Sequence, residues 1–278
     1  MKLLRLLLAL AAVAVVAGVA YVNQTTEPAA GKMANAAQKF LDTLSENQKK
    51  QTQFDFDDKE RTNWHFVPVQ NNDKKPTRKG LPLGEMDGKQ RTAALELLRA
   101  GTSPDGYTKA TTIISLEEIL RDLEKGGAMV RNPGWYFIAV FGPPSKTGKW
   151  GWRVEGHHLS LNFTIDKGKV VSATPAFFGA NPAEVKAGKH KGLRTLPEAE
   201  DRARELFKSL DKDQRKLAYR EKRFAEIEEA KAKPNVGPPV GLPGSKLTAK
   251  QRDVLQKLIE GYANRMPPEV AAAQLAGV

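Results

Sequence analysis

Two adjacent histidines, His157 and His158, are the side chains of this sequence best suited to acid–base chemistry. An imidazole titrates near neutral pH, so it can give or take a proton, and a nearby carboxylate can fix the orientation of its ring. Arg153 and Glu155 precede the pair, and His65 lies in a second segment rich in acidic and aromatic residues. The candidate catalytic residues are therefore His158, Glu155, His65 and Arg153.

Large aromatic side chains close to these residues indicate a surface for ligand binding. Tryptophans precede both the histidine pair and His65, and an exposed indole offers a ligand an apolar face and one N–H donor. The candidate ligand-binding residues are Trp64, Trp150, Trp152, His157 and Asn162. A third interpretation is that these residues build a polar core.

Alternation of apolar and polar residues predicts strands on both sides of the histidines. The apolar residues occupy even positions over residues 150–154 but odd positions over residues 159–165. We expect a β-bulge or sharp bend at Gly156 to cause this shift, since glycine tolerates such a backbone best. The bend would place His157 on the apolar face. It would align on the polar face Arg153, Glu155, His158, Ser160 and Asn162.

A divalent metal is a less favoured occupant of this region. Adjacent residues of a regular strand point in opposite directions, so His157 and His158 could share one ion only if the bend turned them together. Further ligands would have to come from His65, Glu155, Asp55 or Asp57, and no metal-binding spacing such as His-Glu-x-x-His occurs. The sequence also lacks a phosphate-binding glycine loop, a dinucleotide-binding glycine pattern and any cysteine nucleophile. The sequence therefore identifies no cofactor.

The amino terminus predicts export. Lys2 and Arg5 precede the apolar run Leu6–Val22, in which residues 18 and 20 are small enough for a signal peptidase. Residues 1–20 are therefore predicted to be a signal peptide, or an uncleaved anchor, because the run has the minimum length for crossing a membrane. We expect a periplasmic or secreted protein, or a membrane-anchored one if the segment is retained.

The composition limits the classes of binding partner that are expected for this protein. The 278 residues carry a net charge of +12 and contain no cysteine, so the fold depends on a hydrophobic core rather than on disulfides. A basic exported protein suits an anionic envelope polymer, although the lysines are mixed with acidic residues as on solvated helices. No basic stripe with interleaved aromatic residues occurs, so no nucleic acid is expected as a partner. Membrane contact is expected only through an uncleaved amino-terminal segment.

Four similar segments mark helix starts. In each, a Ser, Asp or Thr is followed three residues later by Gln, which is the pattern of a capping box, and an apolar residue precedes the cap. Their spacing of roughly 40, 120 and 40 residues excludes a solenoid repeat. The four segments are Leu44–Lys49, Met86–Arg91, Leu210–Arg215 and Leu247–Arg252.

The fold class predicted from these signals is α+β, with one domain in which a central antiparallel β-meander is flanked by helices from both ends of the chain. The domain is expected to span residues 35–278, after a flexible lead-in over residues 21–34. Helices are expected over residues 32–50, 87–100, 115–124, 195–208, 211–230 and 248–265, with a short one after Pro268. Strands are expected over residues 135–141, 150–155, 157–165 and 169–174.

Several of these segments together resemble the family called domain of unknown function 3500. The resemblance covers roughly residues 35–275 and rests on stretches such as Trp150–Asn162 and Thr174–Pro182, with Arg78–Leu81 and the helix containing Gln251. It implies a single domain and no established activity. Asn132 departs from the family pattern, in which an aspartate is expected before Pro133.

Two functional classes follow. The protein is either a hydrolytic enzyme that uses a histidine and Glu155, with or without a metal, or a non-catalytic module. The module would bind a small ligand or a cell-envelope polymer through exposed tryptophans and Arg153.

Overall fold

The computed structural model describes residues 27–222, 227–233 and 235–278, and the predicted signal peptide or anchor over residues 1–20 lies outside them. Its centre is a mixed seven-stranded sheet, in which the neighbouring strands β3, β4, β5 and β6 form an antiparallel meander. Two short strands extend the outer edge of β3, β1 in parallel and β2 antiparallel, and β7 pairs with β5. The strands are β1 (Gln53–Phe54), β2 (Leu81–Pro82), β3 (Phe137–Phe141), β4 (Trp150–Gly156), β5 (Leu159–Asp166), β6 (Lys169–Ser172) and β7 (Ala176–Phe178).

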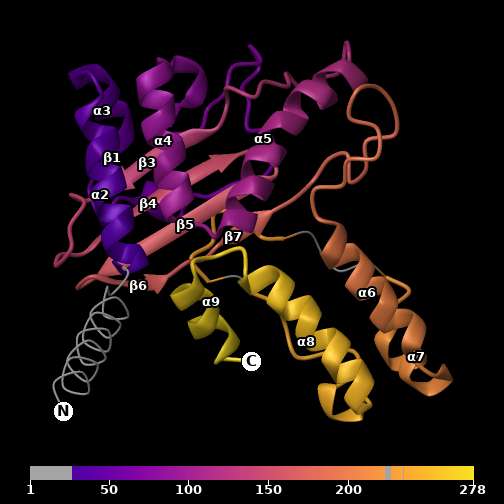
Figure 1. Cartoon of the computed structure of the whole chain (residues 1–278). Coiled ribbons are helices and arrows are strands. Elements are labelled where there is room, and N and C mark those ends of the chain that lie inside the picture. Colours follow the sequence, from indigo (N-terminus) through magenta and orange to yellow (C-terminus); the bar gives the residue numbers. More distant parts are fainter. Residues whose placement is uncertain (1–26, 223–226, 234) are drawn as a thin grey trace, which may run out of the picture.

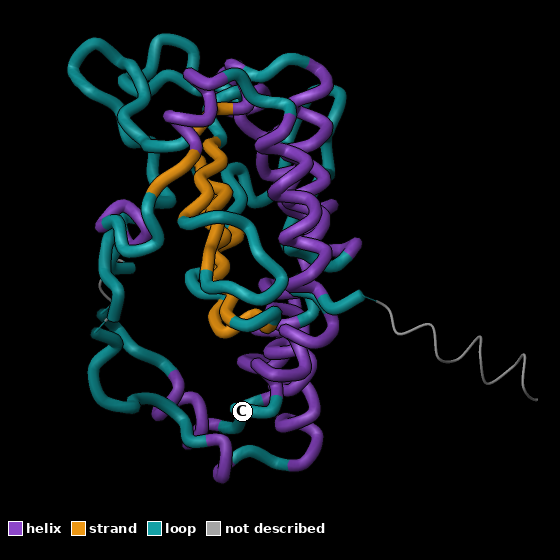
Figure 2. Tube along the Cα trace, turned by 90° about the vertical axis from the view of Figure 1, so that its left-hand side faces the viewer, coloured by secondary structure: helices purple, strands orange, loops and turns teal. Residues whose placement is uncertain are grey.

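Helices cover one face of the sheet and irregular loops cover the other, as the edge-on view of the strands in Figure 2 shows. The α-helices are α2 (Ala29–Asp42), α3 (Glu46–Thr52), α4 (Gly88–Ala100), α5 (Pro104–Leu123), α6 (Pro197–Ser209), α7 (Lys212–Ala218), α8 (Ala249–Ala263) and α9 (Pro268–Leu275). Three 3-10 helices accompany them, η1 (Lys59–Thr62), η2 (Leu83–Glu85) and η3 (Gly244–Lys246). Helices α2, α4 and α5 lie against the sheet, whereas α6, α7 and α8 extend beyond its end (Figure 1). This architecture confirms the α+β class with helices from both ends of the chain.

The hydrophobic core lies between the sheet and the helices α2, α4 and α5. It combines apolar side chains of β3, β4 and β5 with residues such as Phe40 of α2 and Leu97 of α4, both fully buried. The other face of β4 and β5 carries polar side chains, which the loops cover. Burial of apolar surface thus fixes the orientation of the sheet, and the polar face is covered separately.

All four predicted capping boxes are present. The side chains of Ser45, Asp87, Asp211 and Thr248 each accept a hydrogen bond from the backbone N–H of the glutamine three residues later. The side-chain oxygen of that glutamine accepts one from the backbone N–H of the cap residue. The signal is reliable because both partners are local in sequence.

Helix boundaries differ from the expectations where a cap was overlooked. The segment expected as one helix over residues 32–50 is divided by Ser45 into α2 and α3. Helix α5 begins at Pro104, well before residue 115, because Ser103 caps it. Helix α7 ends at Ala218, and residues 227–230, at the end of the helix predicted over residues 211–230, form a loop.

The expected flexible lead-in over residues 21–34 differs from the structure in its second part. Residues 29–34 form the first turns of α2, where Ala30 and Met33 are buried in the core. The small side chains of this turn allow it to pack closely against the core, although its composition alone is also typical of a flexible segment. Within the part of the chain that the structure describes, no helix is long and apolar enough to cross a membrane.

Candidate functional site

The paired histidines form the turn of a β-hairpin. Gly156 pairs with Leu159 across β4 and β5, so His157 and His158 are the two residues that connect the strands. His158 adopts a left-handed backbone with φ of 59°. The apolar residues do move from even to odd positions, as the sequence indicated. The predicted β-bulge or sharp bend at Gly156 is wrong, because a two-residue turn between the strands produces the same shift.

The polar face predicted around Glu155 exists without His158. Arg153 pairs with Asn162 across the two strands, and Glu155 pairs with Ser160. All four residues are buried. Segment 59–67 contacts Arg153 and Glu155 directly and helps to exclude solvent from them.

Glu155 is held by four groups and is only 1% exposed. One carboxylate oxygen accepts a hydrogen bond from Arg78 Nε at 2.9 Å. The other accepts from the backbone N–H of His65 at 2.9 Å and from the Ser160 hydroxyl at 3.1 Å, and it lies 3.6 Å from Arg153 Nε. Burial lowers the pKa of Arg78, an effect that the charge of Glu155 opposes.

Arg153 is bound equally firmly. Its guanidinium forms an ion pair with Glu60 at 2.6 Å and donates to the backbone carbonyls of Glu60 and Asn63 at 2.9 and 3.1 Å. Arg153 and Glu155 thus attach the segment containing η1 to the sheet. The structure brings these two predicted catalytic residues together as parts of a buried network.

The ring of His65 points away from Glu155 and toward a residue far along the chain. Its Nδ1 lies 3.2 Å from a carboxylate oxygen of Glu229, and its Nε2 lies 3.1 Å from the side-chain oxygen of Asn63. Glu229 also accepts hydrogen bonds from the backbone N–H groups of Phe66 and Val67. The side chain of His65 therefore links two loops, and only the backbone of His65 contacts Glu155.

His157 is buried, and its Nδ1 contacts a carboxylate oxygen of Glu117 on α5. Arg131 Nη1 lies 3.4 Å from the same ring nitrogen, and the hydroxyl of Tyr136 donates to the His157 carbonyl at 2.8 Å. His157 Nε2 has no hydrogen-bond partner among the described residues, and it is not fully enclosed by other atoms. The Glu117 carboxylate thus fixes the orientation of the His157 ring, and Nε2 is left without a partner among the described residues.

His158 is half-buried, and its ring meets that of His157 edge to face, with centroids 4.1 Å apart. Burial is the main cause that lowers the pKa of His158 to about 4, with a smaller contribution from the charge of His157 that Glu117 partly opposes. The Nδ1 atom of His158 is enclosed and has no hydrogen-bond partner among the described residues. His158 is therefore neutral near pH 7.

The low pKa of His158 predicts acid sensitivity. Below pH 6.5 the imidazole of His158 takes up a proton in the unfolded chain, whereas in the folded protein it does so only near pH 4. The free energy of unfolding therefore falls as the pH decreases through this interval. His158→Asn, which tolerates the left-handed backbone, should flatten that part of the curve. Urea unfolding as a function of pH measures the effect, with His190→Asn at an exposed loop residue as the control. Equal slopes for the wild type and His158→Asn would contradict the assignment.

The three tryptophans predicted to bind a ligand, Trp64, Trp150 and Trp152, are buried. Trp150 and Trp152 are 0% and 1% exposed and lie in the core beneath α2 and α4. The indole of Trp152 stacks on Phe163 with centroids 4.6 Å apart. Trp64 is also buried, beside Phe66. The expectation of exposed tryptophans is therefore wrong, because alternation identified their face correctly but that face is the core side.

Several residues of the network were not identified from the sequence. They come from segments distant in the chain, and none carries a local signal that connects it to the histidines. They are Glu60, Arg78, Glu117, Arg131 and Glu229.

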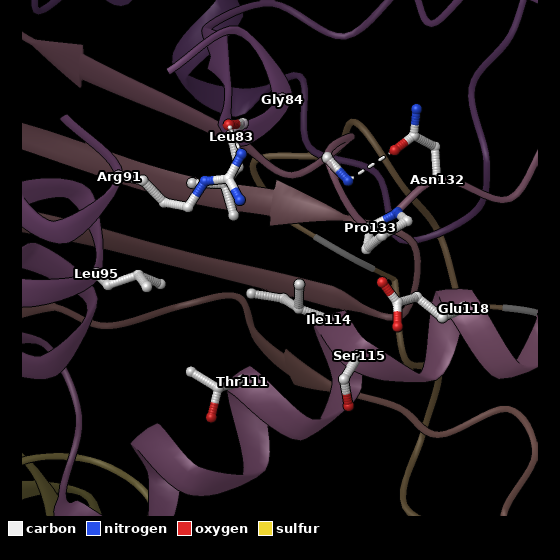
Figure 3. A pocket seen from close by; sticks show the side chains of 11 residues that line it. Leu83, Gly84, Arg91, Leu95, Thr111, Ile114, Ser115, Glu118, Asn132 and Pro133 are labelled. Atoms are coloured by element: carbon white, nitrogen blue, oxygen red, sulfur yellow. Dashed lines mark hydrogen bonds between the residues drawn. The ribbon is translucent and has the colours of Figure 1, made fainter. Parts of the chain in front are cut away.

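An open cavity of about 490 Å³ lies between α4, α5 and the loop Asn132–Gly134. In the close view of Figure 3, Arg91 of α4 and Glu118 of α5 reach it from opposite sides, while Leu95 and Ile114 present apolar surface between them. Arg91 donates to the Leu83 carbonyl at 3.0 Å, and the side-chain oxygen of Asn132 accepts from Gly134 N–H at 2.8 Å. Among the described residues, neither Arg91 nor Glu118 forms an ion pair. No sequence motif marks this site.

Metal ligation has no support from side-chain geometry. Within residues 27–222, 227–233 and 235–278, no three His, Asp or Glu side chains gather as they would around an ion. His157 and His158 contact each other, but Asp55 and Asp57 do not join them.

Comparison with known proteins places the chain in a family. Residues 26–278 match the family described as protein of unknown function (DUF3500), so the chain belongs to it, which confirms the resemblance predicted from the sequence. No curated protein and no solved structure matches the chain.

Proposed function

We propose that this member of the DUF3500 family is a binding protein for a small zwitterionic ligand, of the size of an amino acid or a dipeptide. The observation that carries the proposal is the pair of opposite charges, Arg91 and Glu118, at the two sides of one cavity (Figure 3). The cavity volume of about 490 Å³ lies in the range typical of small-molecule sites.

The ligand chemistry follows from the lining. The Arg91 guanidinium can bind a carboxylate through two parallel hydrogen bonds, and the Glu118 carboxylate can accept from an ammonium group. Leu83, Leu95 and Ile114 would contact an apolar side chain of the ligand. A free amino acid and a free dipeptide share this chemistry, since both carry an ammonium group and a carboxylate.

Calorimetric titration with a panel of dipeptides tests the proposal. We expect Arg91→Gln to weaken binding of a free dipeptide by roughly 10- to 100-fold, since one charge-assisted interaction contributes about 1.5–3 kcal/mol. Glu118→Gln should have a similar effect, and Arg121→Gln, at an exposed residue of α5 outside the cavity, should have none. Dipeptides with blocked ends should lose affinity for the wild type. Binding that is unaffected by Arg91→Gln and by blocking would exclude this function.

A second candidate, hydrolysis, rests on the His157–Glu117 pair. The carboxylate holds Nδ1, so Nε2 could act as a general base toward water, as in other histidine–carboxylate arrangements. Chromogenic ester and phosphoester substrates test this candidate. His157→Asn should abolish turnover and His190→Asn, in an exposed loop, should retain it. Equal turnover by both variants would exclude the histidine.

Export of the protein belongs to the same proposal. The support is the basic and apolar sequence of residues 1–20, in which residues 18 and 20 are small. Mass spectrometry of protein recovered from a bacterial host should find a chain that begins near residue 21 in the periplasmic fraction. An intact chain with Met1 in the cytoplasm would contradict export, and an intact chain in the membrane would indicate the uncleaved anchor.

A further inference from the structure

The helices flanking the sheet contain one structural unit twice. The first unit runs from α2 through α3 and, after an intervening loop, through β2, η2 and α4. The second runs from α6 through α7 and, after its own loop, through η3 and α8. In both, a long helix precedes a short capped helix, and a 3-10 helix precedes a second capped long helix.

Hydrogen bonds between the capping boxes show the equivalence. In the first unit, the side-chain amides of Gln48 and Gln90 donate to each other at 3.0 and 2.9 Å. In the second, Gln214 and Gln251 do the same at 2.9 Å in both directions. Each pair therefore joins a short helix to the following long helix through two reciprocal bonds.

Sequence and backbone agree over the segment before the second capped helix. Gly80-Leu81-Pro82 corresponds to Gly241-Leu242-Pro243, and Lys89-Gln90-Arg91 corresponds to Lys250-Gln251-Arg252. The two glycines have left-handed φ values of 107° and 97°. The two prolines have ψ values of 146° and 141°. The backbone before η3 is thus preset in the conformation of β2.

In the first unit this segment binds a strand. Leu81 pairs with Ile138 of β3, and the N–H groups of Leu83 and Gly84 donate to the carbonyls of Tyr136 and Gly134 at 2.8 and 2.9 Å. A Cβ atom at Gly80 would lie only 2.7 Å from the Ile138 carbonyl oxygen, so the strand passes directly over the glycine.

In the second unit the same edge is open. The equivalents of the two donors, Gly244 and Ser245, are exposed, and their N–H groups have no backbone partner among the described residues. A Cβ atom at Gly241 or Gly244 would meet nothing within 4 Å. The donors and the extended backbone are present, but this unit has no strand to receive them.

Charge identifies the kind of strand that fits. Segment 241–252 contains Lys246, Lys250 and Arg252 and no acidic residue, whereas the first unit carries Glu85 and Asp87 where the second has Lys246 and Thr248. We propose that Leu242–Ser245 is a strand-binding edge that takes an extended, acidic segment of a partner protein. Backbone hydrogen bonds would supply the pairing and the lysines the preference for acidic residues.

The probe for this proposal is a fluorescent peptide of alternating Glu and Val, with the Lys/Val peptide for comparison, and fluorescence anisotropy as the readout. Gly244→Pro removes one donor N–H that has no partner in the described structure and places proline at the start of η3, where its ring is tolerated. Gly244→Ala keeps the N–H and is the matched control.

We expect the Glu/Val peptide to bind and Gly244→Pro to weaken binding about tenfold or more, while Gly244→Ala leaves it unchanged. N-methylation of alternate peptide amides should weaken binding to a similar extent. No binding of the Glu/Val peptide, or equal affinities for the proline and alanine variants, would overturn the proposal. So would binding that salt abolishes but N-methylation leaves intact, since that result indicates charge attraction without strand pairing.

Discussion

Glu155→Leu is expected to lower the free energy of unfolding by about 3–5 kcal/mol, because it leaves buried cations without their counter-charge. Arg78 and Arg153 both face this carboxylate, and the backbone N–H of His65 would lose its acceptor as well. Glu155→Gln should cost less, since it retains one accepting oxygen. Urea unfolding near neutral pH measures both variants.

The control for this effect is Glu46→Gln on α3, which removes an exposed pair with Lys49 and should change stability little. A double-mutant cycle with Arg78→Gln adds a test of the contact itself. The Arg78 substitution should cost less in the Glu155→Leu background than in the wild type. Additive losses would show that the two side chains do not depend on each other.

Trp152→Ala is expected to lower the free energy of unfolding by about 3–5 kcal/mol, because removal of a fully buried indole leaves a cavity. Trp152 is 1% exposed and stacks on Phe163, and Gly101 leaves room for its ring. Trp135→Ala, at the half-buried tryptophan before β3, should cost less. If Trp152 instead lay on a binding surface, its loss would change stability by less than about 0.5 kcal/mol.

Local signals predicted the parts of the fold that depend on neighbouring residues. Each capping box joins residues three positions apart, so the sequence contains both partners, as at Thr248 and Gln251. The alternating residues of β4 and β5 likewise identified the apolar and polar faces. Helix ends were less accurate where a cap such as Ser103 has no glutamine three residues later.

The turn at the histidines could not be distinguished from a bulge. A two-residue turn and a bulge both shift the parity of the alternation, and His157-His158 is not one of the residue pairs that usually form such turns. Close packing, and not the predicted bend, explains why residue 156 is a glycine. A Cβ atom there would lie 2.3 Å from the ring of Tyr136, which packs against this end of the hairpin.

The sequence did not show that the polar face of β4 and β5 is buried, and the reason is different. Alternation shows which residues share a face but not what covers that face, and the cover comes from Glu60, Arg78 and Glu229, distant in the sequence. The Arg91–Glu118 cavity was missed for the same reason, since two helices contribute one charge each. Such sites depend on packing between elements, which no short motif encodes.

We infer that the functional surface is the cavity between α4 and α5 rather than the polar face of the sheet. NMR titration of the protein with a free dipeptide tests it most directly, because each backbone amide reports separately. We expect chemical-shift changes confined to residues around Arg91, Ser115, Glu118 and Gly134, and we expect Arg91→Gln to abolish them. Shifts centred on His157 and His158, with the cavity residues unchanged, would contradict it.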